Sequence, residues 1–198
     1  DEPGELLMAF AAHHIRLGAA EVHIFLDRPN ARLARRLSAI PRVLVRSCDD
    51  AFWKEYGPRP KMQTKRQVIV ANIVYGETQV EWLAHIDADE FIHPSGAMLA
   101  ELAALPDDIV GLRIPVRERV WLRGTAPKTI FDGVFRRAIP GRKTLDDYLV
   151  GEISDYTQRG LVGHTAGKTM ARTGGGRFLS IHAPLHHDIL PLMYSQTT

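Results

Sequence analysis

The segment Trp82-Leu83-Ala84-His85-Ile86-Asp87-Ala88-Asp89-Glu90-Phe91-Ile92 decides the fold that we expect for this chain. Its apolar first half predicts a buried β-strand, and three carboxylates follow within four residues at the carboxyl end of that strand. In open α/β sheets, ligands bind outside the carboxyl ends of the strands. Carboxylates this close repel one another unless a cation or hydrogen-bond donors compensate their charge. The segment therefore predicts a ligand site at the end of a buried strand.

The Asp-x-Asp spacing within this segment suits a hard divalent cation. Mg²⁺ and Mn²⁺ prefer oxygen ligands and also bind phosphates, so such a pair can hold a metal against a diphosphate. Asp87 and Asp89 are thus candidate ligands of Mn²⁺ or Mg²⁺. The alternative interpretation is an acidic, solvated turn or a helix N-terminus, where carboxylates are favourable without any metal.

The sequence before and just after this segment alternates between helical and strand patterns. The expected elements up to residue 60 are a helix over 6–17 ended by Gly18, a strand over 22–26, a helix that carries Leu33, Leu37 and Ile40 on one face, a strand over 43–45, and an irregular aromatic loop over 52–60. They are followed by a helix over 61–75 closed by Gly76, the strand over 82–86, and a helix near 98–105. This alternation predicts a mostly parallel sheet with helices on both of its faces.

Beyond residue 109 the pattern changes to strands and loops, with strand candidates over 109–120, 134–136, 168–172 and 178–182. We therefore expect an α/β fold in one domain, residues 1–198, with an α/β half over 1–108 and a β-rich half over 109–198. A chain of 198 residues with 45% hydrophobic and 24% charged residues has the composition of such a globular domain.

Charge and composition exclude several classes of protein. The chain has 25 Lys and Arg against 23 Asp and Glu, which argues against a dedicated nucleic-acid binder, since those carry a marked basic excess. No run approaches the roughly 20 apolar residues that a membrane span requires. The single cysteine, Cys48, cannot form an internal disulfide, so we expect a reducing compartment such as the cytoplasm.

Histidine is the one residue type in surplus, with nine copies. His182 ends a strand-like run and is the histidine that we expect to join the acidic pair as a metal ligand, because neutral imidazole is a common ligand. His186 and His187 have the pattern of a solvated tail. His13 and His14 are expected to pack or to cap.

Two basic residues are candidates for contact with a phosphate. Lys168 follows Gly167 in a strand-like segment and could meet a phosphate as a point charge, or it could be a solvent-facing strand lysine. Arg66 stands at the start of a predicted helix and could touch a diphosphate, or it could be a solvated helix position.

The stretch 82–94, WLAHIDADEFIHP, resembles the "W…iDxDEFi.P" segment of glycosyltransferase family 2-like proteins, including those of family 92. Shorter matches follow in the same order along the chain: the opening over 1–18, the strand VHIFLD over 22–27, Lys65-Arg66-Gln67, and the pair HTAGK over 164–168 and Ile181-His182. The resemblance covers nearly the whole chain, apart from 140–160.

This resemblance implies a GT-A fold and the transfer of a sugar from a nucleotide-sugar donor, of UDP type, to a saccharide or lipid-linked acceptor. It implies that Asp89 binds the metal, that Asp87 lies nearer the ribose or a metal-bound water, and that His182 completes the metal shell. Asp27, Arg66, Asp87 and Lys168 then fall on the donor side. The family pattern begins with a strand before its acidic opening, so either that strand lies outside residues 1–198 or the domain is incomplete.

The sequence leaves two questions open: which carboxylate is the general base, and which of several functions the chain has. An inverting transferase needs a carboxylate to activate the acceptor hydroxyl, and Asp146 and Asp147 have the loop character expected of it, although Asp132, Glu152 and Asp155 are alternatives. The competing functions are a metal-dependent phosphohydrolase or nuclease, and a non-catalytic domain that binds a nucleotide or a saccharide. Peripheral association with a membrane is compatible with a lipid-linked acceptor.

Overall fold

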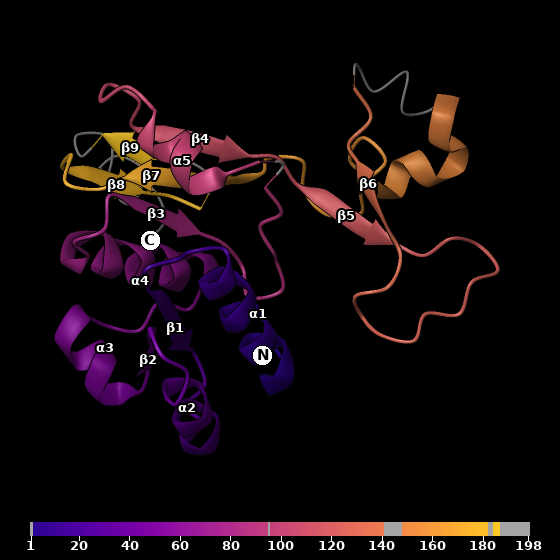
Figure 1. The fold of residues 1–198 in the computed structure, drawn as a ribbon. Coiled ribbons are helices and arrows are strands. Elements are labelled where there is room, and N and C mark those ends of the chain that lie inside the picture. The colour runs from indigo at the N-terminus through magenta and orange to yellow at the C-terminus, as the bar shows by residue number, and fades with distance from the viewer. Residues whose placement is uncertain (1, 95, 141–147, 182–183, 187–198) are drawn as a thin grey trace. The chain divides into compact units, whose positions relative to one another are not determined.

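The computed structural model describes residues 2–94, 96–140, 148–181 and 184–186 (Figure 1). Within these residues the fold is mixed α/β, with small sheets and short to medium helices. The chain divides into two compact units: a larger one of residues 1–112 with 170–198, and a smaller one of residues 113–169. The expected boundary at 108/109 between two halves stays a prediction.

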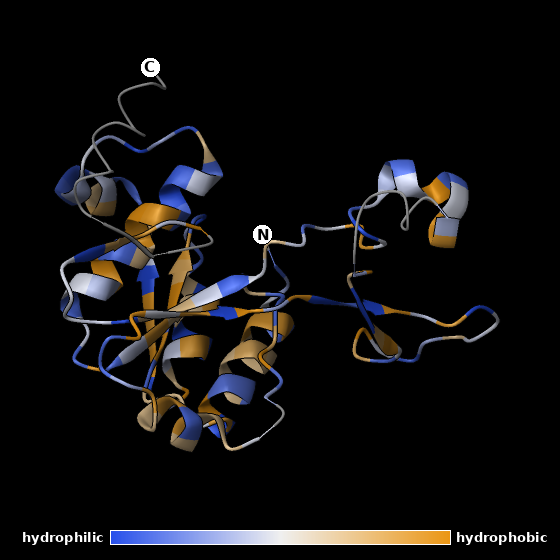
Figure 2. Ribbon diagram, turned by 90° about the horizontal axis from the view of Figure 1, so that it is seen from above, coloured by the Kyte–Doolittle hydropathy of each residue, from blue (hydrophilic) through white to orange (hydrophobic). Residues whose placement is uncertain are grey.

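The larger unit contains most of the helices and strands. In chain order up to residue 112 its elements are α1 (Gly4–Arg16), β1 (Val22–Leu26), α2 (Ala31–Ser38), β2 (Val43–Ser47), α3 (Asp50–Tyr56), α4 (Gln63–Glu77), β3 (Trp82–His85), α5 (Met98–Ala103) and the start of β4 (Gly111–Ile114). Figure 2 shows both hydrophobic and hydrophilic stretches on the strands of this unit.

Strands β1 and β2 pair in parallel, with Val22 opposite Val43 and Leu26 opposite Ser47. Parallel neighbours require a crossover connection, and α2 supplies it. Alternate residues of β1 are buried, and they form a core with the inner face of α1 and with Leu37 of α2. The core members are Leu7, Phe10, Ala11, Val22, Ile24, Leu26, Leu37 and Val43.

Local capping signals set several helix ends. Gly18 has φ +98° just after α1, in the left-handed region that favours glycine. The Asn30 side chain accepts a hydrogen bond of 3.0 Å from the Leu33 backbone N–H and so begins α2. Asp49 does the same for α3, at 2.9 Å from the Phe52 N–H. The aromatic loop expected over 52–60 is therefore wrong for its first part, which is helical.

The other sheet of the larger unit has the strand order β3-β7-β4, where β7 is Lys168–Arg172. Arg172, the last residue of β7, contacts the neighbouring strand β3 and the residue before it. Its side chain forms an ion pair with Glu81, and its guanidinium lies 4.7 Å from the ring centre of Trp82. Strands β8 (Arg177–Leu179) and β9 (Pro184–His186) then form an antiparallel pair. Asn72 of α4 ties this pair to the helix: its side chain donates to the Leu179 carbonyl and accepts from the Leu179 N–H, each at 2.8 Å.

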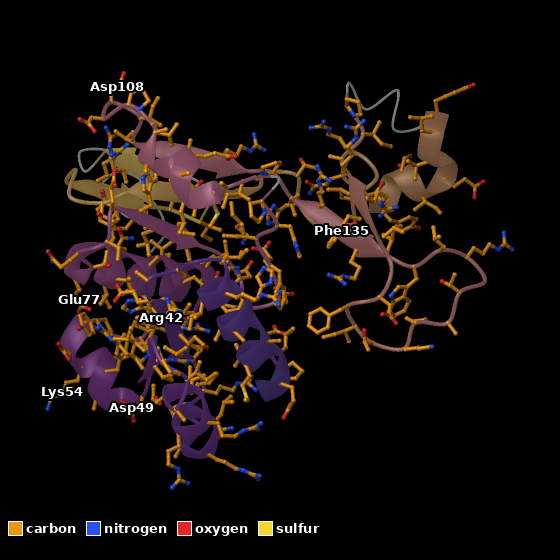
Figure 3. All side chains as sticks on the ribbon, in the orientation of Figure 1. Arg42, Asp49, Lys54, Glu77, Asp108 and Phe135 are labelled. Atoms are coloured by element: carbon orange, nitrogen blue, oxygen red, sulfur yellow. The ribbon has the colours of Figure 1, made fainter. Side chains whose placement is uncertain are left out.

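The smaller unit consists of the antiparallel strands β5 (Arg117–Val120) and β6 (Val134–Arg137), and a 3-10 helix, η1 (Gly151–Tyr156). Glu118 of β5 accepts hydrogen bonds from Arg136 and from the Val162 N–H. The guanidinium of Arg119 lies 4.9 Å from the ring centre of Phe135, which Figure 3 labels on β6.

The expected single, mostly parallel sheet is wrong. The described strands form four small sheets, and the β5–β6 and β8–β9 pairs are antiparallel. The connections within these two pairs contain no helix, so they cannot make the crossover that a parallel pair requires. Among the described residues, no helix is long and apolar enough to cross a membrane.

Candidate functional site

A cavity of about 880 Å³ opens at the carboxyl ends of β1 and β3, within the larger unit. Its lining includes four carboxylates and two guanidiniums among the described residues, so the formal charge of these side chains is negative. The charged lining residues are Glu2, Asp27, Arg28, Arg66, Asp87 and Asp89. Asp27, Arg66, Asp87 and Asp89, which the sequence singles out, are thus brought together around one cavity. We call it the carboxyl-edge cavity.

A tight turn holds the two aspartates of the acidic segment. The Glu90 backbone N–H donates to the Asp87 carbonyl at 3.0 Å, and the Asp87 N–H donates to Glu90 Oε2 at 3.1 Å. Glu90 therefore closes the turn with its own side chain. Asp87 is half-buried and Asp89 is exposed, so the turn presents Asp89 outward.

Helix α4 fixes the side chain of Asp87. Gln67 Nε2 donates a hydrogen bond of 2.9 Å to Asp87 Oδ1, and Gln67 also lines the carboxyl-edge cavity. The sequence did not assign this role to Gln67, although the residue follows Arg66 in the Lys65-Arg66-Gln67 match. Only the packing of α4 beside β3 shows which residue of that helix reaches the acidic turn.

Asp27, just after β1, forms a bidentate ion pair with Arg66 of α4. Arg66 Nε donates to Asp27 Oδ1 at 2.7 Å and its Nη2 donates to Oδ2 at 2.8 Å, while Arg59 adds a hydrogen bond of 3.1 Å. The hydrogen bonds from Arg66, followed by those from Arg59, lower the pKa of Asp27. No pattern in the sequence indicated this contact of Arg59.

The remaining donors of Arg66 hold the chain that leads into α4. Its Nη1 donates to the carbonyls of Pro60 and Lys61, each at 2.9 Å. The Arg66 side chain is only 14% exposed, so it is not the solvated helix position considered above. Arg66 thus clamps the loop before α4 to the end of β1.

Two histidines of α1 hold the chain that follows the acidic turn. His13 Nε2 donates to the Ile92 carbonyl at 2.7 Å, and the Ile92 N–H donates to His14 Nε2 at 3.3 Å. His14 Nδ1 in turn donates to the Phe10 carbonyl at 2.8 Å. His14 is 6% exposed, and burial lowers its pKa to about 4. The expectation that these histidines pack or cap is confirmed.

The other residues considered are outside the cavity, chemically unreactive, or outside the described residues. Lys168 is buried in β7, at 6% exposure, so it is not a solvent-facing strand lysine, and it is not among the residues that line the carboxyl-edge cavity. Cys48 lines the cavity, but burial raises the pKa of its thiol to about 11, which makes it a poor nucleophile. His182, Asp146 and Asp147 lie outside the described residues.

The chemistry of the donor set fits a hard divalent cation. Mg²⁺ is commonly held by one or two carboxylates, with waters and phosphate oxygens in its other positions. Asp87 and Asp89 can supply those carboxylates from the same turn. Within the described ranges no group of three or more His, Cys, Asp or Glu side chains could hold a metal by itself. The pair therefore suits a cation that also binds a substrate phosphate.

Comparisons of the chain with protein-family models, with curated proteins and with solved structures found no match.

Proposed function

We propose that this protein is a metal-dependent glycosyltransferase with a GT-A-like fold, which transfers a sugar from a nucleotide-sugar of UDP type to a hydroxyl group of a saccharide or lipid-linked acceptor. One observation carries the proposal: Asp87 and Asp89 border the same cavity of about 880 Å³ as the Asp27–Arg66 pair. That volume is within the usual range for small-molecule sites, about 300–1,000 Å³. The resemblance of 82–94 to family 2-like glycosyltransferases supports the same function.

The charge of the cavity supports a role for a cation. A diphosphate carries negative charge, and the described lining has more carboxylates than guanidiniums. Mn²⁺ or Mg²⁺ held by Asp87 and Asp89 would offset the repulsion and neutralise the charge that develops on the departing nucleoside diphosphate. We propose His182 as a further ligand and Asp146 or Asp147 as the base that takes the proton of the acceptor hydroxyl.

The protein's own side chains would position the donor. Gln67 fixes one oxygen of Asp87 and so orients that carboxylate before any ligand binds. Asp27 is already engaged by Arg59 and Arg66, so we assign the Asp27–Arg66 pair to shaping the donor side of the cavity rather than to catalysis. The compartment that we propose is the cytoplasm, in accord with the free thiol of Cys48.

The test is calorimetric binding of UDP with and without Mn²⁺ to the wild-type chain, to Asp89→Asn and to Asp108→Asn. Asp108 is also an exposed turn aspartate of the larger unit, but it does not line the cavity, which makes it a matched control. We expect UDP to bind only with Mn²⁺, and Asp89→Asn to weaken this binding at least tenfold, about 1.4 kcal/mol. Asp108→Asn should bind as the wild type does.

The outcomes separate the three functions considered from the sequence. Release of UDP from a UDP-sugar by the wild type and not by Asp89→Asn supports transferase chemistry. Hydrolysis of bis(p-nitrophenyl) phosphate that depends on Asp89 would instead indicate a phosphohydrolase. Metal-dependent binding of UDP-sugar without any turnover would indicate a binding domain. Binding of UDP that is equal with and without metal would refute the assignment of Asp89.

A further inference from the structure

The smaller unit carries most of the exposed large apolar side chains. Of the fourteen such residues among those that the structure describes, eleven belong to residues 113–169. Six of the eleven lie on strands β5 and β6 or on the long loop that joins them (Figure 1): Trp121, Leu122, Ile130, Phe131, Val134 and Phe135. Proteins rarely expose large apolar side chains in clusters, so these six indicate an interaction surface.

The same part of the chain is strongly basic. Residues 117–137, which we call the basic hairpin, contain six Lys and Arg against two carboxylates, in a chain whose charges nearly balance. Both carboxylates are already engaged. Glu118 accepts hydrogen bonds from Arg136 and from two backbone N–H groups, and Asp132 accepts from two backbone N–H groups of its own loop. The basic hairpin therefore presents an excess of positive charge.

The strand register gathers three arginines on one face of the basic hairpin. Residues directly opposite each other in an antiparallel pair share a face, and Arg117 lies opposite Arg137. Arg119 lies opposite Phe135 on that same face, since side chains alternate along a strand. Arg117 and Arg137 are exposed, and like charges in such positions repel each other. An anion between the two guanidiniums would relieve this repulsion.

Hydrogen bonds hold the loop that carries the apolar side chains. Trp121 Nε1 donates to the Asp132 carbonyl at 3.2 Å, and Arg119 donates to the Phe131 carbonyl. Gly133 has φ +119°, and a Cβ there would lie 2.5 Å from a backbone oxygen of β5, so glycine is required where the loop returns. The side chain of Trp121 is nevertheless 58% exposed. The loop thus fixes the indole nitrogen and leaves most of the ring in solvent.

We propose that the basic hairpin docks this protein on a membrane surface that contains anionic phospholipids. Its guanidiniums would bind lipid phosphates, to which arginine can donate two parallel hydrogen bonds. Trp121, Leu122 and Ile130 would enter the boundary between headgroups and acyl chains, where tryptophan is enriched because its ring is apolar and its N–H is polar. This docking surface goes beyond the transfer reaction proposed above and does not depend on it.

Other occupants fit the basic hairpin less well. A single-stranded nucleic acid would meet the arginines, but its bases stack on aromatic rings and gain little from Leu122, Ile130 and Val134. A neutral saccharide would leave the excess of positive charge without a partner. A second copy in a two-fold contact would place one excess of positive charge against another. Anionic lipid matches both the charge and the apolar side chains.

The test is co-sedimentation of the full chain with vesicles of phosphatidylcholine, alone or with about 30% phosphatidylglycerol. We expect binding to the anionic vesicles to be at least tenfold tighter, and to weaken as salt screens the charges. Arg117→Gln/Arg137→Gln should weaken binding to the anionic vesicles at least tenfold. The matched control, Arg32→Gln/Arg35→Gln, removes the same charge from exposed positions of α2 and should bind as the wild type does. Equal losses for the two double variants would overturn the proposal.

A second pair of variants tests the apolar contact. Leu122→Ser should weaken binding to the anionic vesicles at least threefold, because it removes an apolar side chain from the membrane boundary. Met62→Ser is the control, since Met62 belongs to the larger unit and is 56% exposed, against 57% for Leu122. These surface variants should melt as the wild type does. A Leu122→Ser chain that binds as tightly as the Met62→Ser chain would contradict insertion.

Tryptophan fluorescence locates the contact. The chain has three tryptophans, and Trp53 is buried. Brominated lipid in the anionic vesicles should quench the wild type, and this quenching should be lost in Trp121→Phe. Quenching that persists in Trp121→Phe, or that is absent in the wild type, would place the membrane contact away from the basic hairpin and overturn the proposal.

The remaining outcomes distinguish the other occupants and the proposed reaction. Tighter binding to a single-stranded oligonucleotide than to the anionic vesicles would overturn the proposal, as would a dimer in sedimentation equilibrium that Leu122→Ser dissociates. Asp89→Asn should bind the anionic vesicles as the wild type does, and Leu122→Ser should bind UDP with Mn²⁺ as the wild type does. Failure of the docking surface and failure of the proposed donor site are therefore distinguishable.

Discussion

The histidine behind the acidic turn gives the sharpest prediction, because its two ring nitrogens have opposite roles. His14 Nδ1 donates to the Phe10 carbonyl, while Nε2 accepts from the Ile92 N–H, so the ring must be neutral in the folded protein. A second proton would place an N–H donor against another N–H donor. The perturbation is therefore acidification of the wild-type protein, compared with the same acidification of His14→Leu, which cannot take up the proton.

The magnitude follows from the pKa of His14, which burial lowers from 6.5 to about 4. Below pH 6.5 the unfolded chain binds this proton and the folded chain does not, so the free energy of unfolding falls as the pH falls. The loss approaches about 3 kcal/mol at pH 4, from about 1.4 kcal/mol for each pKa unit, and reaches about 2 kcal/mol by pH 5. Most of this window lies above the usual pKa range of carboxylates.

The assay is urea unfolding followed by tryptophan fluorescence at intervals from about pH 7.5 to pH 5. The wild type should lose about 2 kcal/mol of stability over this range. His14→Leu should start from a lower stability, because the Ile92 N–H loses its acceptor, and should show a flatter dependence on pH. Equal slopes for the two proteins, or a His14 pKa near 6.5 by NMR, would refute the reasoning.

Three further substitutions test other contacts by their effect on the free energy of unfolding. Asn72→Leu removes both hydrogen bonds to Leu179 and should lower the free energy of unfolding of the protein by about 2–3 kcal/mol, measured by urea unfolding. A loss of less than about 0.5 kcal/mol would contradict the role of Asn72 in joining α4 to β8. Asn30→Ala removes the N-cap of α2 and should cost about 1 kcal/mol, measured the same way, with Asn30→Ser close to the wild type. Arg66→Lys should cost about 1–2 kcal/mol near pH 7. This difference should shrink as the pH falls below the ordinary pKa of an aspartate toward the lowered pKa of Asp27 in the folded protein, and a difference that is constant with pH would rule out the ion pair as its source.

Local sequence patterns predicted where the strands lie better than they predicted which strands pair with each other. The strand expected over 22–26 is β1 and that over 168–172 is β7, because a run of apolar or alternating residues between turn signals is local information. Which strands pair depends on contacts between residues far apart in sequence, and the expected single sheet was wrong for this reason. The Gly76 stop was also wrong: α4 continues to Glu77, since a helix tolerates an isolated glycine near its end.

The candidate site was partly predictable. Asp27, Arg66, Asp87 and Asp89 each follow a strand or begin a helix in the sequence, and the fold brings them to one cavity. The supporting contacts were not predictable, because nothing in the sequence says that Gln67, rather than a neighbouring residue of α4, reaches Asp87, or that His13 and His14 hold Ile92. These roles depend on how one helix packs against one turn.

The neighbouring positions of β4 and β7 in one sheet have a consequence for how the protein can vary. The chain leaves the larger unit through β4 and returns to it through β7, and everything between these adjacent strands is the smaller unit. Residues 115–167, from the end of β4 to the start of β7, are therefore an insertion between two bonded neighbours of the sheet. Such a module can be lengthened, shortened or exchanged while β1 and β3, which carry Asp27 and Asp87 at their ends, keep their own packing.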